Sequence, residues 1–244
     1  MEDMTESFRD ELESISKGMG ATYFGVAELA PATQSISEQG GAFLTRFPRA
    51  VSHGFVLMDA IVDALKYGSS VAALHTYWHH VYQAVNPRID SISLALAQAL
   101  DKAGFQAFIV PSSQTTDKAG LAGVLSHKLT AHLAGLGWIG KSALLITPKH
   151  GPRVRWGTVL TDAPLEVGTP MHDMCKDCHT CVEACPVRAF TRQPFDIPRP
   201  RSQIFAAEAC DRYLSDQRRT VGVAACGMCV YVCPFGRKKS ERGI

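Results

Sequence analysis

Residues 175–186 read Cys175-Lys-Asp-Cys178-His-Thr-Cys181-Val-Glu-Ala-Cys185-Pro186, which is a C-x2-C-x2-C-x3-C-P run. Bacterial chains with this spacing bind [4Fe–4S] clusters through cysteine thiolates. The first three cysteines can wrap one face of a four-iron cube, whereas the fourth usually ligates the other cluster of a pair. Pro186 removes a backbone donor and turns the chain there. The run therefore predicts one cluster directly and implies a second.

A second run, Cys226-Gly-Met-Cys229-Val-Tyr-Val-Cys233-Pro234, has the same ending but lacks a first cysteine nearby. Cys210 is the only cysteine left for that position, so the eight cysteines make two groups of four. Because the last cysteine of each run crosses to the other cluster, we predict two ligand sets. The first set is Cys175, Cys178, Cys181 and Cys233, and the second set is Cys185, Cys210, Cys226 and Cys229.

Disulfides and zinc are the alternative interpretations of these cysteines. Eight cysteines could form four disulfides in a secreted chain. However, residues 1–20 are acidic and amphipathic, unlike a signal peptide, and 244 residues can build a core without disulfides. Two C-x2-C pairs could bind zinc, but zinc requires neither the third cysteine nor the C-x3-C-P ending. The spacing favours two [4Fe–4S] clusters.

The composition indicates a globular chain, with 46% apolar and 20% charged residues. A net charge of +2 is too balanced to indicate a nucleic-acid-binding protein. No apolar run approaches the ~18 residues of a membrane span, so no membrane association is expected. A cytoplasmic location is expected, because such clusters survive best in a reducing interior. The basic end, with Arg237, Lys238, Lys239 and Arg242, is expected to be solvated.

All eight cysteines follow residue 174. We therefore predict a cysteine-free α/β domain over residues 1–170 and a small cluster domain over residues 171–244. Hydrophobic periodicity and Gly/Pro breaks predict strands at 22–29, 50–58, 105–110, 143–147 and 153–161. They predict helices at 4–19, 71–86, 88–103, 119–136, 187–190 and 205–219. Strands that alternate with helices favour a layered α/β fold.

Residues 131–165 read AHLAGLGWIGKSALLITPKHGPRVRWGTVLTDAPL, and the first cysteine run follows ten residues later. This segment and the double-cluster module resemble the epoxyqueuosine reductase and reductive dehalogenase superfamily. The resemblance implies an α/β (α+β) cobalamin-binding domain related to nitroreductases, followed by a bacterial-ferredoxin-like double-cluster domain. It also implies that electrons pass from the clusters to a bound corrinoid, and that a low-potential donor such as ferredoxin or flavodoxin supplies them.

The same segment supplies the predicted cofactor-binding residues. Its glycines let the backbone approach a bulky ligand or turn tightly. Lys141 and Arg153 could face a phosphate or carboxamide of the cofactor, or they could be surface charges. Trp138 could stack on a flat ring or pack in a core. His132 could line the corrinoid edge or only pack. The predicted cofactor-binding residues are Gly135, Gly137, Trp138, Gly140, Lys141, Arg153 and His132. Tyr77 is a candidate proton donor, with Tyr82 as the alternative, because the dehalogenases use a tyrosine.

Two departures from the superfamily shape the functional prediction. Relatives that act on tRNA carry a long helical-repeat extension, whereas this chain ends eleven residues after Cys233, so a tRNA substrate is not expected. Those reductases also have an acid near the loop after the third strand, and here residues 110–114 read VPSSQ. We predict a cobalamin-dependent iron–sulfur reductase of a small substrate. The alternatives are an electron-transfer or activator protein for a corrinoid protein, and an enzyme with FMN in place of cobalamin.

Overall fold

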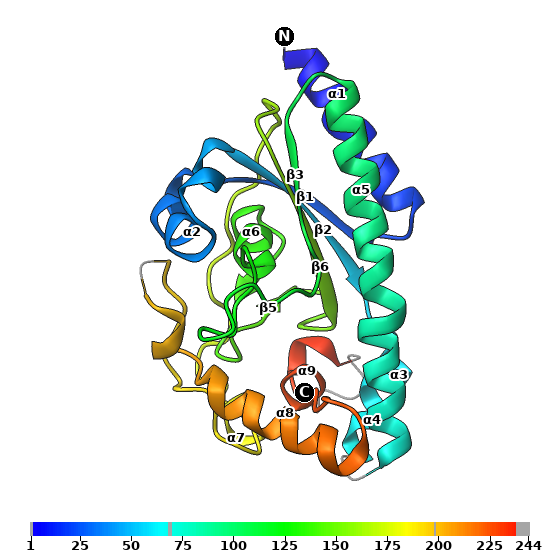
Figure 1. Cartoon of the computed structure of the whole chain (residues 1–244), viewed down its shortest axis with the longest axis vertical. Helices are drawn as coiled ribbons and strands as arrows, with labels where there is room; N and C mark the ends of the chain where they lie inside the picture. The colour runs from blue at the N-terminus through cyan, green and yellow to red at the C-terminus, as the bar shows by residue number, and fades with distance from the viewer. Residues whose placement is uncertain (1, 68–69, 198, 238–244) are drawn as a thin grey trace. The chain divides into compact units, whose positions relative to one another are not determined.

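The computed structural model describes residues 2–67, 70–197 and 199–237, and a four-stranded sheet organises its cysteine-free part (Figure 1). The strands are β1 (Tyr23–Glu28), β2 (Arg49–Val56), β3 (Ala107–Val110) and β6 (Val154–Thr161), in the order β1-β2-β6-β3. β1 pairs with β2, and β3 with β6, in antiparallel register. β1, β3 and β6 lie within ranges that the sequence pattern predicts, β2 begins one residue before its predicted range of 50–58, and the expected layered α/β fold is present.

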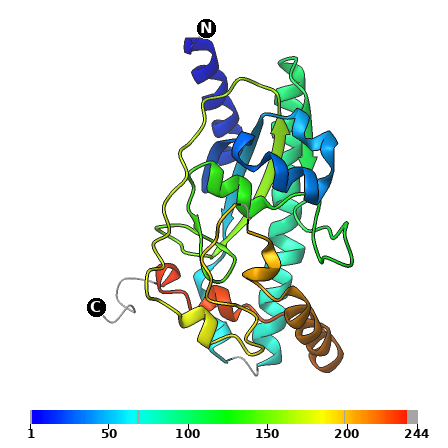
Figure 2. The same cartoon turned by 90° about the vertical axis from the view of Figure 1, so that its left-hand side faces the viewer.

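Helices cover both faces of this sheet. α1 (Glu2–Gly18) and α5 (Asn86–Lys102) pack on one face, and α6 (His127–Leu133) lies on the other with α2 (Thr33–Gly40), as both views show (Figures 1 and 2). The core between the sheet and the first face is mainly apolar, and it also holds a buried hydrogen bond of 2.9 Å between His53 of β2 and Ser93 of α5. Its most buried side chains are Leu12, Val26, Val51, Ile92, Leu96, Leu100 and Val159. Each such side chain contributes roughly 1.5–3 kcal/mol when it leaves water.

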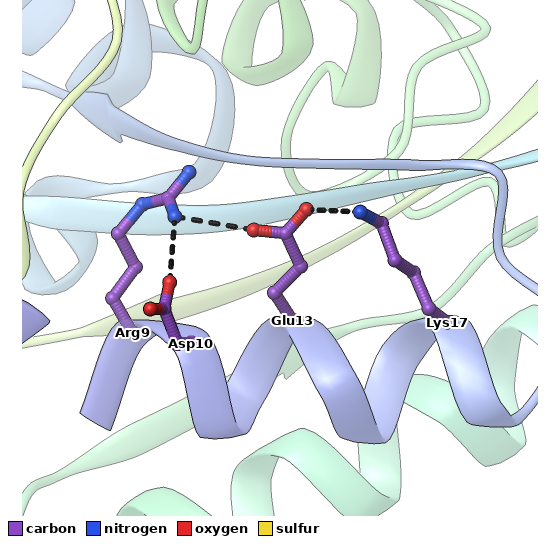
Figure 3. Close-up of polar contacts among 4 residues, drawn as sticks. All are labelled: Arg9, Asp10, Glu13 and Lys17. Atoms are coloured by element: carbon purple, nitrogen blue, oxygen red, sulfur yellow. Dashed lines mark hydrogen bonds and ion pairs between the residues drawn. The ribbon is translucent and has the colours of Figure 1, made fainter. Parts of the chain in front are cut away.

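The outer face of α1 carries charges at helical spacing. Arg9 contacts Glu13 at 3.1 Å and Asp10 at 3.3 Å, and Lys17 contacts Glu13 at 2.6 Å (Figure 3). Pairs four residues apart are neighbours on a helix and stabilise it by roughly 0.2–0.5 kcal/mol each. The opposite face supplies Leu12 to the core, so α1 is amphipathic as its periodicity predicts.

The described residues group into two compact units, each made from three chain segments. The first unit comprises residues 1–55, 86–137 and 155–172, and the second comprises 56–85, 138–154 and 173–244. The predicted boundary divides the chain once, between residues 170 and 171. In the structure, the cysteine-bearing segment instead packs in one unit with residues 56–85 and 138–154 from earlier in the chain. Lys238, Lys239 and Arg242 of the basic end lie outside the described residues.

The second unit is built from short elements around the cysteines. Its first elements are α3 (Asp59–Asp63), α4 (Val71–Trp78) and a π-helix at His79–Val85. A two-stranded hairpin follows, with β4 (Trp138–Ile139) and β5 (Leu145–Ile146). The last elements are α7 (Thr180–Glu183), α8 (Ala207–Val221) and α9 (Met228–Tyr231). Among the described residues, no helix has both the length and the apolar character to cross a bilayer.

Two predicted helices are wrong in whole or in part. The helix expected at 119–136 is confined to α6, because the preceding residues form a turn with an Asp117–Ala122 bridge and a positive φ of 50° at Leu121. Residues 187–190 form no helix, since Arg188 has a φ of 48°. A non-glycine residue in the left-handed region interrupts a right-handed helix. The helices expected at 71–86 and 88–103 are separated by a π-helix at His79–Val85, after which α5 begins at Asn86.

Candidate iron–sulfur centre

The first predicted cysteine set comes together in the second unit. Burial raises the pKa of the Cys181 thiol to about 11, and the nearby Cys175 and Cys178 thiols raise it further. Burial likewise raises the pKa of Cys233 to about 12, with Cys175 and Cys181 as its thiol neighbours. Cys233 is therefore a neighbour of the first run although it ends the second. At neutral pH the Cys181 and Cys233 side chains are therefore thiols, so binding of iron must release their protons.

The second predicted set is assembled from three elements. α8 carries Cys210, α9 carries Cys229, Cys226 lies just before α9, and Cys185 lies just after α7. Burial raises the pKa of Cys210 to about 11, and Cys226 and Cys185 add to the shift. Burial raises the pKa of Cys229 to about 12, with contributions from Cys226, Cys210, Cys181 and Cys185. The isolated Cys210 thus joins the second run.

Both sets consist of free thiols, and the two lie close together. All eight cysteines are unbridged, so the disulfide interpretation is wrong for this structure. α7 packs against α9, and Cys181 of the first set acts electrostatically on Cys229 of the second. In the described part of the chain, no three cysteine, histidine or carboxylate side chains meet at a position for one metal ion. Each set is defined by electrostatic interactions among its own thiols. Four thiols per set is the donor chemistry that a [4Fe–4S] cluster requires.

The hairpin that carries the predicted cofactor-binding residues packs on the first set. The Trp138 indole Nε1–H donates to Cys175 Sγ at 3.4 Å, and its ring meets Phe235 edge-on at 4.8 Å. A Cβ on Gly140 would lie 3.0 Å from Cys175 Sγ and 2.8 Å from Ile146. Gly140 is thus required for the close approach of a cluster-binding cysteine. Trp138 is almost fully buried, so its ring packs in the core of this unit.

Lys141 reaches into the loop of the first run. Its ammonium donates to the backbone oxygen of Lys176 and to that of Cys178 at 3.2 Å. The ammonium also lies 3.4 Å from His179 Nε2, and His179 Nδ1 lies 2.8 Å from the backbone carbonyl oxygen of Asp177. A carbonyl only accepts, so His179 Nδ1 carries the proton and Nε2 accepts from Lys141. Lys141 is buried, with 8% of its surface exposed.

Arg153 forms an internal cross-link of the second unit. Its guanidinium donates to Asp59 Oδ1 at 2.8 Å and to Asp63 Oδ1 at 2.6 Å, and the residue is 1% exposed. Gly151, two residues before Arg153, has a φ of +55°, and a Cβ there would lie 2.4 Å from the Gly236 nitrogen. These contacts tie α3 and the chain after Cys233 to residues 151–153.

The remaining predicted cofactor-binding residues belong to the first unit. Gly135 has a φ of +75°, and a Cβ there would lie 2.5 Å from the Thr169 oxygen. His132 Nδ1 lies 3.1 Å from the Gly137 oxygen, so the imidazole closes the turn that these glycines form. The segment 132–137 is thereby packed against residues of its own unit. The structure therefore divides the seven predicted residues between the two units.

Tyr77 lies beside the second cysteine set. It is buried in α4, and a Cβ on Gly227 would lie 2.9 Å from its ring and 2.5 Å from Leu65. Gly227, which has a φ of 72°, connects Cys226 to α9. The tyrosine therefore shapes the turn between Cys226 and Cys229. Its role as a proton donor stays a prediction.

Sequence reasoning missed an acid at the loop after β3. Asp90, on α5, accepts from the Ser112 backbone nitrogen and from Ser112 Oγ, both at 2.9 Å. Residues 110–114 carry no acid, as expected, but the structure brings the Asp90 carboxylate to Ser112 from 22 residues earlier. Only tertiary contact places Asp90 there, so no local motif could have identified it.

Comparisons with known proteins fit this arrangement. Residues 174–236 match the protein family described as the 4Fe-4S double cluster binding domain. An epoxyqueuosine reductase from Synechococcus sp. (strain CC9605) is 31% identical over 175 residues, which cover 70% of this chain and 51% of the relative. The chain is a relative of the epoxyqueuosine reductases. The match covers 31% of the length of an epoxyqueuosine reductase from Listeria monocytogenes and 51% of the length of the Synechococcus relative, so this chain spans about half or less of these relatives.

Solved structures show the same fold. One of them is a reductive dehalogenase, and its structure is described as suggesting a mechanism for B12-dependent dehalogenation. The alignment covers 98% of this chain and 33% of the dehalogenase chain. The TM-score is 0.69 and the identity 19%. An epoxyqueuosine reductase solved with an epoxyqueuosine-modified tRNA stem loop aligns with 96% of this chain and 66% of its own, with a TM-score of 0.62 and 20% identity. That ligand gives no support to our expectation that tRNA is not a substrate.

Proposed function

We propose that this chain is an iron–sulfur oxidoreductase that binds two [4Fe–4S] clusters and delivers their electrons one at a time to an acceptor. The observation that carries the proposal is the assembly of two four-thiol sets, joined by the interaction of Cys181 with Cys229. The first set would hold one cluster and the second set the other. Each cluster would supply one-electron redox chemistry at a potential that its surroundings adjust.

The residues around the thiols would have defined tasks in this function. Trp138 donates to the Cys175 sulfur and packs edge-on against Phe235. Lys141 holds the backbone between Cys175 and Cys178. Tyr77 and Leu65 cover the turn at Gly227. A hydrogen-bonded shell of this kind adjusts the potential of a cluster.

A corrinoid is the acceptor that we propose, in line with the B12-dependent dehalogenase that shares this fold. When bound, a corrinoid supplies a cobalt centre that can reduce a carbon–oxygen or carbon–halogen bond. Within the second unit, the Trp138 indole, the Lys141 ammonium and the two terminal nitrogens of the Arg153 guanidinium are bonded to protein. These three residues do not fit the corrinoid contacts expected of them, so we assign them no step there. The comparisons give no support to FMN.

Reduction of an epoxide to an alkene is the reaction class that we propose. It consumes two electrons and two protons and releases one water. Two one-electron clusters match this demand. Asp90, held at the loop after β3 by Ser112, is our candidate for the protonating acid, because a carboxyl group can pass a proton to a nearby oxygen.

The test uses anaerobically reconstituted, reduced protein with cobalamin and two substrates, an epoxyqueuosine-containing tRNA stem loop and a halogenated phenol. We expect alkene product from the stem loop, with two electrons consumed per product. Halide release instead would assign a dehalogenase. Cluster oxidation by cobalamin without either product would favour an electron-transfer protein, and clusters that cobalamin cannot oxidise would contradict the proposal.

A further inference from the structure

The loop between Cys175 and Cys178 contains a strained residue. Lys176 has a φ of 43°, in the left-handed region that glycine adopts readily and other residues rarely do. The Lys176 side chain is exposed, so side-chain packing does not explain this conformation. A non-glycine residue in this region persists only when its surroundings enforce it. The turn directly separates two predicted ligands of the first cluster.

Lys141 is the group that enforces the turn. Its ammonium donates to the Lys176 oxygen and to the Cys178 oxygen, one on each side of the bend. Its third contact, His179 Nε2, lies on the residue after Cys178. In the described part of the chain, no carboxylate forms an ion pair with this ammonium, so its donors are directed to the loop. Three contacts within residues 176–179 fix the backbone between the two sulfurs.

We propose that Lys141 is a positioning residue for the first cluster, and that it holds the strained turn at Lys176 so that Cys175 and Cys178 stand at ligand separation. The inference rests on the proposed function, since it requires a cluster at the first set. The second set provides an internal reference, because its turn uses Gly227, which adopts its φ of 72° without strain. A glycine at position 176 should therefore make the lysine clamp unnecessary.

The experiment compares Lys141→Met, Lys141→Arg and the double variant Lys141→Met with Lys176→Gly, each reconstituted anaerobically with ferrous iron and sulfide. Iron loss to a chelator and the EPR signal of each reduced cluster are recorded. We expect Lys141→Met to lose the first cluster, or to release its iron roughly fivefold faster or more, as the loss of support for one strained residue implies. The second cluster should be unaffected. Lys141→Arg should keep both clusters, and Lys176→Gly should restore the first cluster to Lys141→Met.

Arg188 supplies a matched control. It also has a positive φ, 48°, and an exposed side chain in the cysteine segment, but Lys141 does not contact it. Arg188→Gly should therefore leave the Lys141→Met defect in place. Unchanged iron retention and EPR in Lys141→Met, or failure of Lys176→Gly to restore the first cluster, would overturn the inference. Wild-type protein that binds no cluster at the first set would instead overturn the proposed function.

Discussion

The indole nitrogen of Trp138 donates a hydrogen bond to the sulfur of Cys175 at 3.4 Å, across 37 residues of sequence. This contact attaches the β4–β5 hairpin to the first cysteine set. The segment that resembles a cofactor-binding motif thus serves, in this structure, as a wall of the cluster site. A donor aimed at a ligand sulfur stabilises the more negatively charged, reduced state of a cluster.

Replacing Trp138 with Phe should lower the potential of the first cluster. The change removes the N–H donor and keeps most of the ring that packs on Phe235. We expect at least a tenfold rise in the oxidised-to-reduced ratio at fixed potential, which is about 59 mV for one electron. A redox titration followed by EPR measures this ratio. A larger shift in the second cluster than in the first would contradict the assignment of Cys175.

Changing Cys210 to Ala should remove one cluster and leave the other. Cys210 interacts with Cys226 and Cys185, but not with the first set. We expect roughly four irons to remain per chain and one EPR signal to disappear. The paired variant, Cys175→Ala, should lose the complementary signal. Loss of the same signal in both variants would show that the sets are divided differently.

Replacing Gly140 with Ala should impair the first cluster. The new Cβ would lie 2.8 Å from Ile146 and 3.0 Å from Cys175 Sγ, so the hairpin or the cysteine must shift. We expect lower iron content at the first set and a normal second cluster, measured by iron analysis and EPR. Gly18→Ala is the control, since no atom lies within 4 Å of its new Cβ. Normal iron content in Gly140→Ala would contradict this packing.

Acid should destabilise the first unit through two buried histidines. Burial lowers the pKa of His53 to about 3 and that of His127 to about 4, from 6.5. His127 also faces Arg155, Asp90 and Lys128. As the pH falls below 6.5, these histidines gain protons in the unfolded chain but not yet in the folded one. The contribution of the two neutral histidines to the free energy of unfolding is therefore complete above pH 6.5. It is lost as the pH falls toward 4 and 3, by roughly 2 kcal/mol per histidine between pH 7 and 5.

The change in thermal midpoint between pH 7 and pH 5 measures this effect. His127→Gln keeps a side chain that can bond to the Pro111 oxygen and to Thr158, as His127 does now. We expect a smaller drop in the midpoint for this variant than for wild type. An equal drop in both proteins would show that His127 does not remain neutral in the folded state.

Asp90→Asn should slow substrate reduction while both clusters remain. The amide still accepts from Ser112 but cannot supply a proton. We expect at least a tenfold lower rate with reduced protein, and unchanged iron content and EPR. An unaltered rate would remove Asp90 from the proton path.

The cysteine pattern predicted more than the local periodicity could. The spacing of the two runs, with Cys210 as the one cysteine left, predicted two groups of four, and electrostatic interactions link Cys181 to Cys175 and Cys178 and link Cys210 to Cys226 and Cys185. The helix expected at 119–136 was mostly wrong, because the bridge at Asp117 and Ala122 replaces helical hydrogen bonds.

Tertiary contacts explain what the sequence could not predict at the site. Lys141 and Arg153 are cations that a pattern cannot distinguish from phosphate-binding residues. Lys141 lies 35 to 38 residues before its partners, and Arg153 follows its two aspartates by 94 and 90 residues. Only the folded chain shows that these cations bond to protein, and the same holds for Asp90 at Ser112.

The iron and sulfide content of anaerobically reconstituted wild-type protein, with EPR during stepwise reduction, tests the central proposal most directly. Two clusters on two four-thiol sets predict about eight irons and eight sulfides per chain. They also predict two cluster signals that broaden one another when both are reduced, because Cys181 and Cys229 lie close together. Four irons with a single signal, or bound zinc without sulfide, would contradict it.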